Sequence, residues 1–179
     1  MSSSKDMLRA GDPVFHPMHG FGTVHGLTRR DPAYPIRDVA AGGAPSGQEQ
    51  DYYDIDLPGN GTLLVPVSRA ESVGLRLLTN GVAAITACLF APAQSLPEDS
   101  RERAAVLRAR GRSFEPTALA DSVRDMLAQS RGRNLSPTEK TWLDNSCEHL
   151  STEAALVDGI ARSEARAAIR NAVDQLSGR

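Results

Sequence analysis

The sequence contains few aromatic residues and almost no cysteine. Its 179 residues include four Phe, three Tyr and one Trp, so a hydrophobic core must consist mainly of Leu, Val, Ile and Ala. The two cysteines, Cys88 and Cys147, lie far apart in the sequence, which excludes a small disulfide-stabilised fold. Hydrophobic residues still make up 40% of the chain and charged residues 23%, a composition that permits a packed core.

Long hydrophobic stretches are also missing. No apolar run reaches the roughly 18 residues that a membrane-spanning helix needs. The first eight residues contain no apolar segment of the length found in secretory signals. We therefore expect a cytoplasmic protein without membrane association.

The chain has little net charge, but its charge is unevenly distributed. The formal net charge of −2 argues against a general binder of polyanions. However, residues 101–112, RERAAVLRARGR, contain five Arg and one Glu. Such a run is either a solvated helix face, the usual case, or a phosphate-contacting surface, since guanidinium groups donate in pairs to phosphate oxygens.

Residues 12–78 have the pattern of short strands separated by Gly and Pro turns. Apolar residues alternate from Tyr53 to Leu57, which predicts a half-buried strand. A turn at 58–61 then leads to a returning strand at 62–67. Shorter strands are expected at 13–17 and 21–27, and a long, mobile hairpin loop at 31–50. Residues 1–79 are therefore predicted to form a small antiparallel β-barrel.

After residue 79 the apolar residues follow a helical period. Helices are predicted from Val82 to a stop at Pro92, from Pro97 to about Arg110, and from Pro116 onward. Ser136 begins a capping box that starts a further helix, and a last helical region covers 151–176, with a break near 162–163. Residues 80–179 thus form a second, all-α domain of about five helices, and the fold class is α+β.

Catalytic and metal-binding motifs are scarce. His16, His19 and His25 are close in sequence, but no cysteine accompanies them, and we interpret them as turn and surface histidines. Gly20 and Gly22 lack the remainder of a phosphate-binding motif and fit a tight hairpin better. No pattern combines a nucleophile, a base and an oxyanion hole. We therefore expect no enzymatic activity, no metal and no cofactor.

Several of these segments resemble one family. Residues 11–24, GDPVFHPMHGFGTV, resemble the "GD-x-V-x-x-P-x-x-G-x-G-x-[VI]" opening of the CarD/CdnL/TRCF family. The pairs and runs at 52–53 (YY), 65–67 (VPV) and 72–76 (SVGLR) resemble the end of the same module. A weaker match, VRDM at 123–126 followed by LSPTEK at 135–140, extends the resemblance over nearly the whole chain.

The resemblance implies a bacterial transcription regulator. In this family a Tudor/SH3-like N-terminal module binds the RNA polymerase β subunit. A helical C-terminal domain touches promoter DNA at the upstream edge of the bubble, and the usual effect is on open-complex stability. Transcription-repair coupling factor shares only the first module, attached to helicase motors that are absent here, so the CarD/CdnL branch fits better. We expect a monomer that binds promoter DNA weakly on its own.

The family pattern also indicates site residues. By position, the polymerase contact falls on Arg30 and on Thr62, Leu63, Leu64 and Val65. Leu64 stands where some members carry Arg, which favours an apolar or backbone-dominated interface. The predicted DNA contacts are the arginines of the basic run, namely Arg101, Arg103, Arg108 and Arg110.

One position departs from the family. Members carry a Trp just ahead of the basic run, which wedges against the minor groove at the bubble edge; here Glu98 stands there. The only Trp, Trp142, falls in the fourth predicted helix, where we expect it to be at least partly buried. A carboxylate cannot stack on a base pair and repels phosphates. Three interpretations remain open: DNA binding without wedging, polymerase binding alone in competition with a Trp-bearing paralogue, or wedging by another residue such as Leu96 or Phe114.

Overall fold

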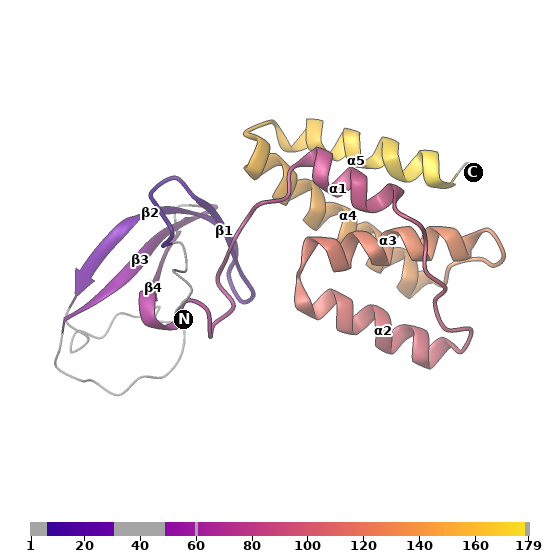
Figure 1. Cartoon of the computed structure of the whole chain (residues 1–179), viewed down its shortest axis with the longest axis horizontal. Coiled ribbons are helices and arrows are strands. Elements are labelled where there is room, and N and C mark those ends of the chain that lie inside the picture. Colours follow the sequence, from indigo (N-terminus) through magenta and orange to yellow (C-terminus); the bar gives the residue numbers. More distant parts are fainter. Residues whose placement is uncertain (1–6, 31–48, 60, 178–179) are drawn as a thin grey trace. The chain divides into compact units, whose positions relative to one another are not determined.

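The computed structural model describes residues 7–30, 49–59 and 61–177. The chain divides into two compact units, the first ending at Leu78 and the second beginning at Thr79. The first unit contains an antiparallel sheet and the second contains five α-helices (Figure 1). The predicted α+β fold is confirmed. Most of the loop predicted at 31–50 lies outside the described residues.

The sheet has five strands in the order β4-β3-β2-β1-β5. Their bounds are Pro13–His16 (β1), Gly20–Arg30 (β2), Gln50–Leu57 (β3), Gly61–Pro66 (β4) and Arg76–Leu77 (β5), with a short 3-10 helix η1 at Val67–Arg69. All neighbouring strands are antiparallel. The described strands form an open sheet rather than a closed barrel, with β4 and β5 at its edges. β5 escaped prediction because two residues are too few to display a period.

The β3–β4 hairpin supplies much of the core of this unit. Tyr53 pairs with Val65 and Ile55 with Leu63, so the alternating residues of both strands point to one side and are buried. Gly22 on β2 has no room for a side chain, because a Cβ there would lie 2.7 Å from Ile55 Cγ2 and 2.8 Å from the Asp56 carbonyl oxygen. The family-like glycine thus permits close approach of β2 to β3.

The second unit consists of helices α1 to α5. Their bounds are Val82–Phe90 (α1), Ser100–Ser113 (α2), Pro116–Ser130 (α3), Pro137–Asp158 (α4) and Arg162–Ser177 (α5). α2 starts later than predicted because the Asp99 carboxylate accepts the N–H groups of Arg101 and Glu102 and so fixes the helix start. α4 carries the predicted capping box at Ser136 and runs on to Asp158, where Gly159 ends it with a left-handed φ of 64°.

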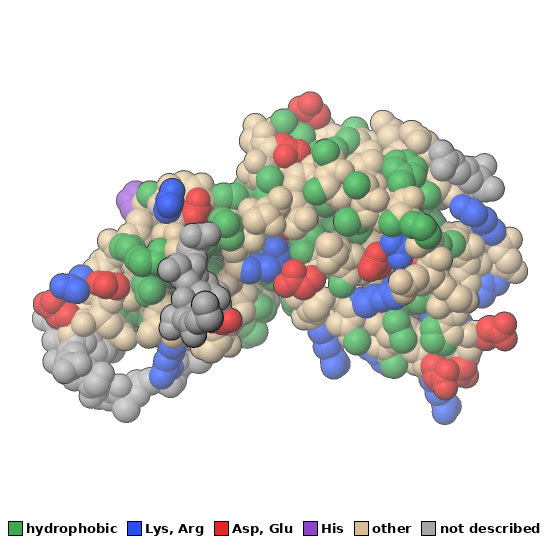
Figure 2. All heavy atoms as spheres, viewed as in Figure 1, with side chains coloured by type: hydrophobic (Ala, Val, Ile, Leu, Met, Phe, Trp, Pro, Cys, Tyr) green, Lys and Arg blue, Asp and Glu red, His purple; other side chains and the backbone are tan. Residues whose placement is uncertain are grey.

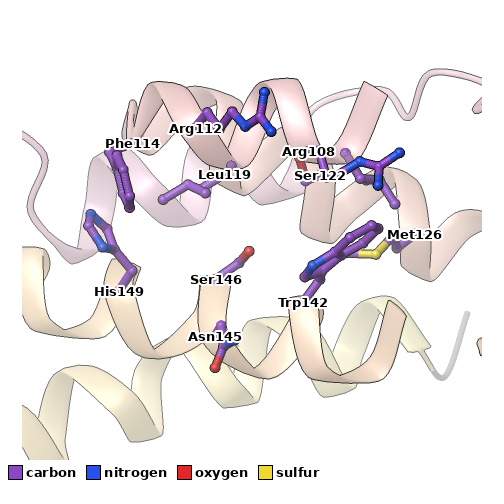
Figure 3. Close-up of a pocket in the computed structure, with 12 residues that line it drawn as sticks. Arg108, Arg112, Phe114, Leu119, Ser122, Met126, Trp142, Asn145, Ser146 and His149 are labelled. Carbon is purple, nitrogen blue, oxygen red and sulfur yellow. The ribbon is translucent and has the colours of Figure 1, made fainter. Parts of the chain in front are cut away.

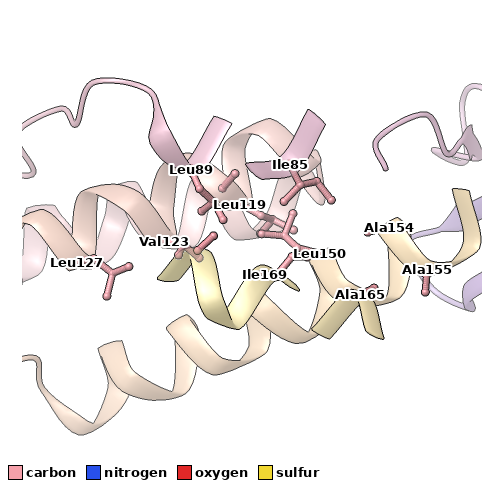
Figure 4. Packing of buried hydrophobic residues seen from close by; sticks show 12 residues of the cluster. Ile85, Leu89, Leu119, Val123, Leu127, Leu150, Ala154, Ala155, Ala165 and Ile169 are labelled. Atoms are coloured by element: carbon pink, nitrogen blue, oxygen red, sulfur yellow. The ribbon is translucent and has the colours of Figure 1, made fainter. Parts of the chain in front are cut away.

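The helices share one main core, to which α2 does not contribute. Side chains from α1, α3, α4 and α5 meet in it (Figure 4); they include Ile85, Leu89, Leu119, Val123, Leu150 and Ile169. α2 packs on α3 through a smaller cluster formed by Leu96, Leu107 and Met126. The attachment of α2 therefore depends more on polar contacts than that of the other helices.

Candidate functional site

The β4 strand is one edge of the sheet, and its predicted contact residues differ in exposure. Within the described part of the first unit, β4 pairs with β3 on one side and with no strand on the other. Thr62 is exposed, whereas Leu63, Leu64 and Val65 are only 1%, 6% and 1% exposed. Accordingly, a partner at this edge meets the main chain of β4 and the Thr62 side chain rather than the leucines.

Pro66 indicates which donors of β4 face the free edge. Proline has no N–H, so an edge strand tolerates it where the missing donor would point away from the neighbouring strand. N–H directions alternate along a strand, which places those of Leu64 and Thr62 on the free side as well. The edge thus presents donors at two of the predicted positions.

Arg30 is not close to that edge segment. It is exposed at the end of β2 and lies opposite Gln50 of β3, whereas Thr62 lies opposite Asp56. These two β3 residues are six positions apart, or about 20 Å along the strand. The sheet therefore does not bring Arg30 and Thr62 into one contact.

The four arginines predicted to contact DNA divide into two pairs on opposite faces of α2. Arg103 is 8% exposed and donates from Nε to Glu139 Oε1 at 2.8 Å and from one Nη to the carbonyl oxygens of Pro97 and Glu98. Arg110 donates to Asp125 Oδ2 at 2.9 Å. These two arginines serve as internal counterions, whereas the sequence analysis predicted that they contact DNA.

The outward face of α2 carries the remaining arginines. Arg101 and Arg108 are exposed and lie seven residues apart, or about two helical turns, and Arg112 follows one turn later. We call these three residues the arginine stripe. Figure 2 shows acidic side chains gathered at the start of α2 and basic side chains spread along the helix. Exposed positive charge therefore runs along the outward face of α2 from Arg101 in its first turn to Arg112, with acidic residues beside its start.

Two buried carboxylates explain why two of the five arginines of the basic run face inward. Asp125 on α3 is 1% exposed and accepts hydrogen bonds from Arg110, from Arg124 Nε and from the Gln94 N–H, each at 2.9 Å. Glu139 on α4 accepts from Arg133, Arg103 and the Ser136 N–H. A buried carboxylate without a counterion is costly, so α2 and its neighbours provide guanidinium groups.

Hydrogen bonding lowers the pKa of Glu139 well below its usual range. The largest cause is the side-chain hydrogen bond from Arg133; burial acts in the opposite direction, and the Ser136 N–H and Arg103 add to the lowering. Arg133 is correspondingly held in its charged form, with a raised pKa caused mainly by the same hydrogen bond. The cluster therefore stays ionised near neutral pH and connects α2 to the start of α4.

The position at which the family carries Trp is exposed and acidic. Glu98 lies directly before the capping residue Asp99, and its carbonyl oxygen accepts a hydrogen bond from Arg103. Leu96 is 4% exposed and packed with Leu107, so it has no surface available for wedging. Phe114 is half-buried and follows the opposite end of α2, a helix of 14 residues and about 21 Å. Trp142 is half-buried, as predicted.

One of the three N-terminal histidines is not a surface residue. His16 is 2% exposed, and its Nδ1 accepts the Met18 N–H at 3.1 Å, which corrects the prediction of a surface histidine. Burial, and then the neighbouring His19, lower its pKa below the usual value. Residues 7–30, 49–59 and 61–177 contain no group of three or more His, Cys, Asp or Glu side chains able to hold a metal.

A cavity that the sequence did not predict lies among α2, α3 and α4. It measures about 360 Å³ and is lined by apolar residues, by Trp142 and by two members of the arginine stripe. In Figure 3 the Trp142, Ser146 and His149 side chains extend from α4 toward the other two helices. No periodicity signals such a cavity, because it depends on the spacing between three packed helices.

The chain thus combines two modules: an antiparallel sheet with β4 at one edge, and a bundle of five helices. Residues 8–78 match the family model described as the CarD-like/TRCF RID domain, and residues 84–170 match the CarD C-terminal domain. The chain therefore belongs to the CarD family and is a transcription regulator of that family. This confirms the resemblance of its sequence motifs to the family.

A curated relative agrees with this assignment. The chain is 25% identical over 163 residues to a Bacillus subtilis (strain 168) protein named "Putative transcription factor YdeB". The match covers 88% of this chain and 97% of that protein, so both modules are included. Among the described residues, no helix combines the length and apolar character needed to cross a bilayer.

Proposed function

We propose that this chain binds the RNA polymerase β subunit through the free edge of β4 and contacts promoter DNA near the upstream edge of the bubble through its helical unit. It thereby modulates the stability of the open complex. In this proposal the chain acts by binding alone, without catalysis or a cofactor, and works in the cytoplasm at the nucleoid. The observation that supports the polymerase contact is the side of β4 on which no strand of the described residues pairs.

The β4 edge suits strand addition. Within the described residues its outer main-chain groups meet no other strand, so they offer hydrogen bonds to an extended segment of a partner, while its leucines are buried in the unit. Because the Leu64 side chain is buried, the contact is dominated by the backbone. A partner strand at β4 does not reach Arg30, so we propose Arg30 as a separate contact at the other end of the sheet.

The arginine stripe supports the DNA contact. Arg101, Arg108 and Arg112 are exposed on one face of α2, whereas Arg103 and Arg110 are occupied by carboxylates. Three phosphate contacts give weak binding with a modest salt dependence. The helical unit therefore depends on the polymerase contact to concentrate it at a promoter.

Glu98 favours a second candidate function. Its exposed carboxylate lies beside Asp99 and one turn from Glu102, so this end of α2 repels phosphates. A polymerase-binding protein that lacks the wedge, and that competes with a Trp-bearing paralogue, accounts for this acidic end. The lifetime of open complexes separates the two functions: a regulator lengthens or shortens it alone, whereas a competitor changes it only when the paralogue is present.

The polymerase contact is tested with a matched pair of variants in the full chain. Thr62→Pro removes one donor from the free edge, whereas Thr62→Val keeps the donor and the strand preference. We expect Thr62→Pro to lose most of its binding to purified β subunit and Thr62→Val to keep it. Circular dichroism checks that both variants remain folded. Equal binding by the two folded variants contradicts a main-chain contact at β4.

A further inference from the structure

The cavity among α2, α3 and α4 combines an aromatic wall with a cationic rim. Its apolar lining includes Leu107, Leu119 and Met126. Trp142 lies on one side of it, next to Met126 (Figure 3). Its volume of about 360 Å³ lies in the range of pockets that hold small organic groups. Ser146 also lines it, and its hydroxyl provides a hydrogen-bonding group for the edge of a planar ring.

The charges around the cavity favour an anion. Its lining includes Arg108 and Arg112 but no carboxylate. Elsewhere in this unit Arg103, Arg110 and Arg124 pair with carboxylates, whereas Arg108 and Arg112 form no ion pair within the described residues. The two guanidinium groups at the rim are thus available to a phosphate.

Phe114 adds a strained aromatic residue to the same cavity. It ends α2 with a φ of 51°, and it is the one non-glycine residue with positive φ among those described. Its ring lies 5.8 Å from the ring of His149, centroid to centroid. Bulky residues seldom adopt this backbone conformation, and such strain is concentrated at functional sites.

We propose that this cavity receives one unpaired base of single-stranded DNA, stacked on Trp142, while Arg108 and Arg112 hold the phosphates on either side. The inference rests on the proposed DNA contact and specifies its target: a strand separated in the bubble rather than duplex. Aromatic rings with neighbouring cations are the usual means of binding single strands. A paired base cannot enter a concave site without leaving its stack.

The single tryptophan provides a direct readout. We measure the fluorescence of Trp142 in the full chain during titration with a short oligothymidylate, the same strand carrying an abasic site at each second position, a duplex, and free thymidine monophosphate. We expect the intact single strand to quench the emission and to bind roughly 5- to 150-fold more tightly than the abasic strand. The duplex should bind the arginine stripe without quenching.

A cavity-filling variant is the matched test. A Cβ at Gly111 would meet no atom within 4 Å, so Gly111→Leu starts a larger side chain from open space at the cavity wall and favours the helix. We expect it to abolish quenching by the single strand, whereas Gly111→Ala retains it. Anisotropy of a labelled strand shows whether DNA is still held by the stripe.

The outcomes separate this inference from the proposed function. Binding of the strand without quenching, or equal quenching in Gly111→Leu, overturns the cavity as a base site and leaves the stripe as the DNA contact. Quenching by thymidine monophosphate alone overturns the single-strand assignment in favour of a free nucleotide. Failure of all DNA probes to bind, with β-subunit binding intact, overturns the DNA contact itself.

Discussion

Arg103 and Arg101 lie two residues apart on α2 yet should have opposite roles. Arg103 is buried and makes three hydrogen bonds to Glu139, Pro97 and Glu98, whereas Arg101 is exposed. Replacing each by Met keeps a flexible aliphatic chain and removes the charge. The pair therefore distinguishes an internal counterion from a surface contact within one helix.

The expected loss for Arg103→Met follows from its contacts. Removing one partner of a buried ion pair typically costs 3–5 kcal/mol. Here Glu139 keeps Arg133 and the Ser136 N–H, so we expect a smaller loss of about 2–4 kcal/mol in the free energy of unfolding. In a unit of this size the loss corresponds to a fall in Tm of roughly 10–25 °C. Arg101→Met should change stability by less than about 0.5 kcal/mol.

Two measurements check this contrast. Urea unfolding followed by Trp142 fluorescence reports on the small cluster beneath α2, because Trp142 packs against it. DNA affinity as a function of salt, measured where both variants are folded, should lose about one unit of slope in Arg101→Met and none in Arg103→Met. A stable Arg103→Met, or a slope lost from Arg103 and kept by Arg101, would refute the division of α2 into two faces.

Three further expectations follow from other residues. Because the folded-state pKa of Glu139 is lowered, its stabilising contribution is complete above its unfolded pKa and is lost as pH falls through the folded pKa. Urea unfolding at a series of acidic pH values should show this loss of stability. Glu139→Gln should make the stability depend less on pH in that range. The pKa of His16 is lowered by burial, so the unfolded state binds its proton more readily and stability falls as pH drops below about 6.5; an NMR titration should place its pKa below that value. Gly22→Ala should destabilise the first unit by about 1–3 kcal/mol, because the added Cβ collides with Ile55 and with the Asp56 carbonyl oxygen. Gly111→Ala places its Cβ in open space and should stabilise α2 by about 0.5–1 kcal/mol. Thermal unfolding measures both changes.

Much of the fold could be predicted because local patterns carry it. The alternation through Tyr53 and Leu57 and the turn after it specify the β3–β4 hairpin, and the capping box at Ser136 specifies the start of α4. The two-residue strand β5 could not be predicted, since it depends on a distant pairing with β1. Local signals set the start of helices more reliably than their length.

The site was harder to predict because burial depends on partners far away in sequence. Arg103 pairs with a carboxylate 36 positions later, and Arg110 with one 15 positions later. A signal was nevertheless present: both arginines share the α2 face of the buried Leu107, at spacings of four and three residues. An arginine on the apolar face of a helix indicates an internal ion pair more often than a surface contact.

The placement of α2 outside the main hydrophobic core has a consequence for how this family member can diversify. Its inward side is held by the ion pairs of Arg103 and Arg110, while its outward arginines belong to neither hydrophobic cluster. If α2 contacts nucleic acid as proposed, reversing the charge of an outward residue should change that affinity and leave the packing of the helix intact. Affinity and folding would then depend on separate residues of the same helix, and each could change in evolution without the other.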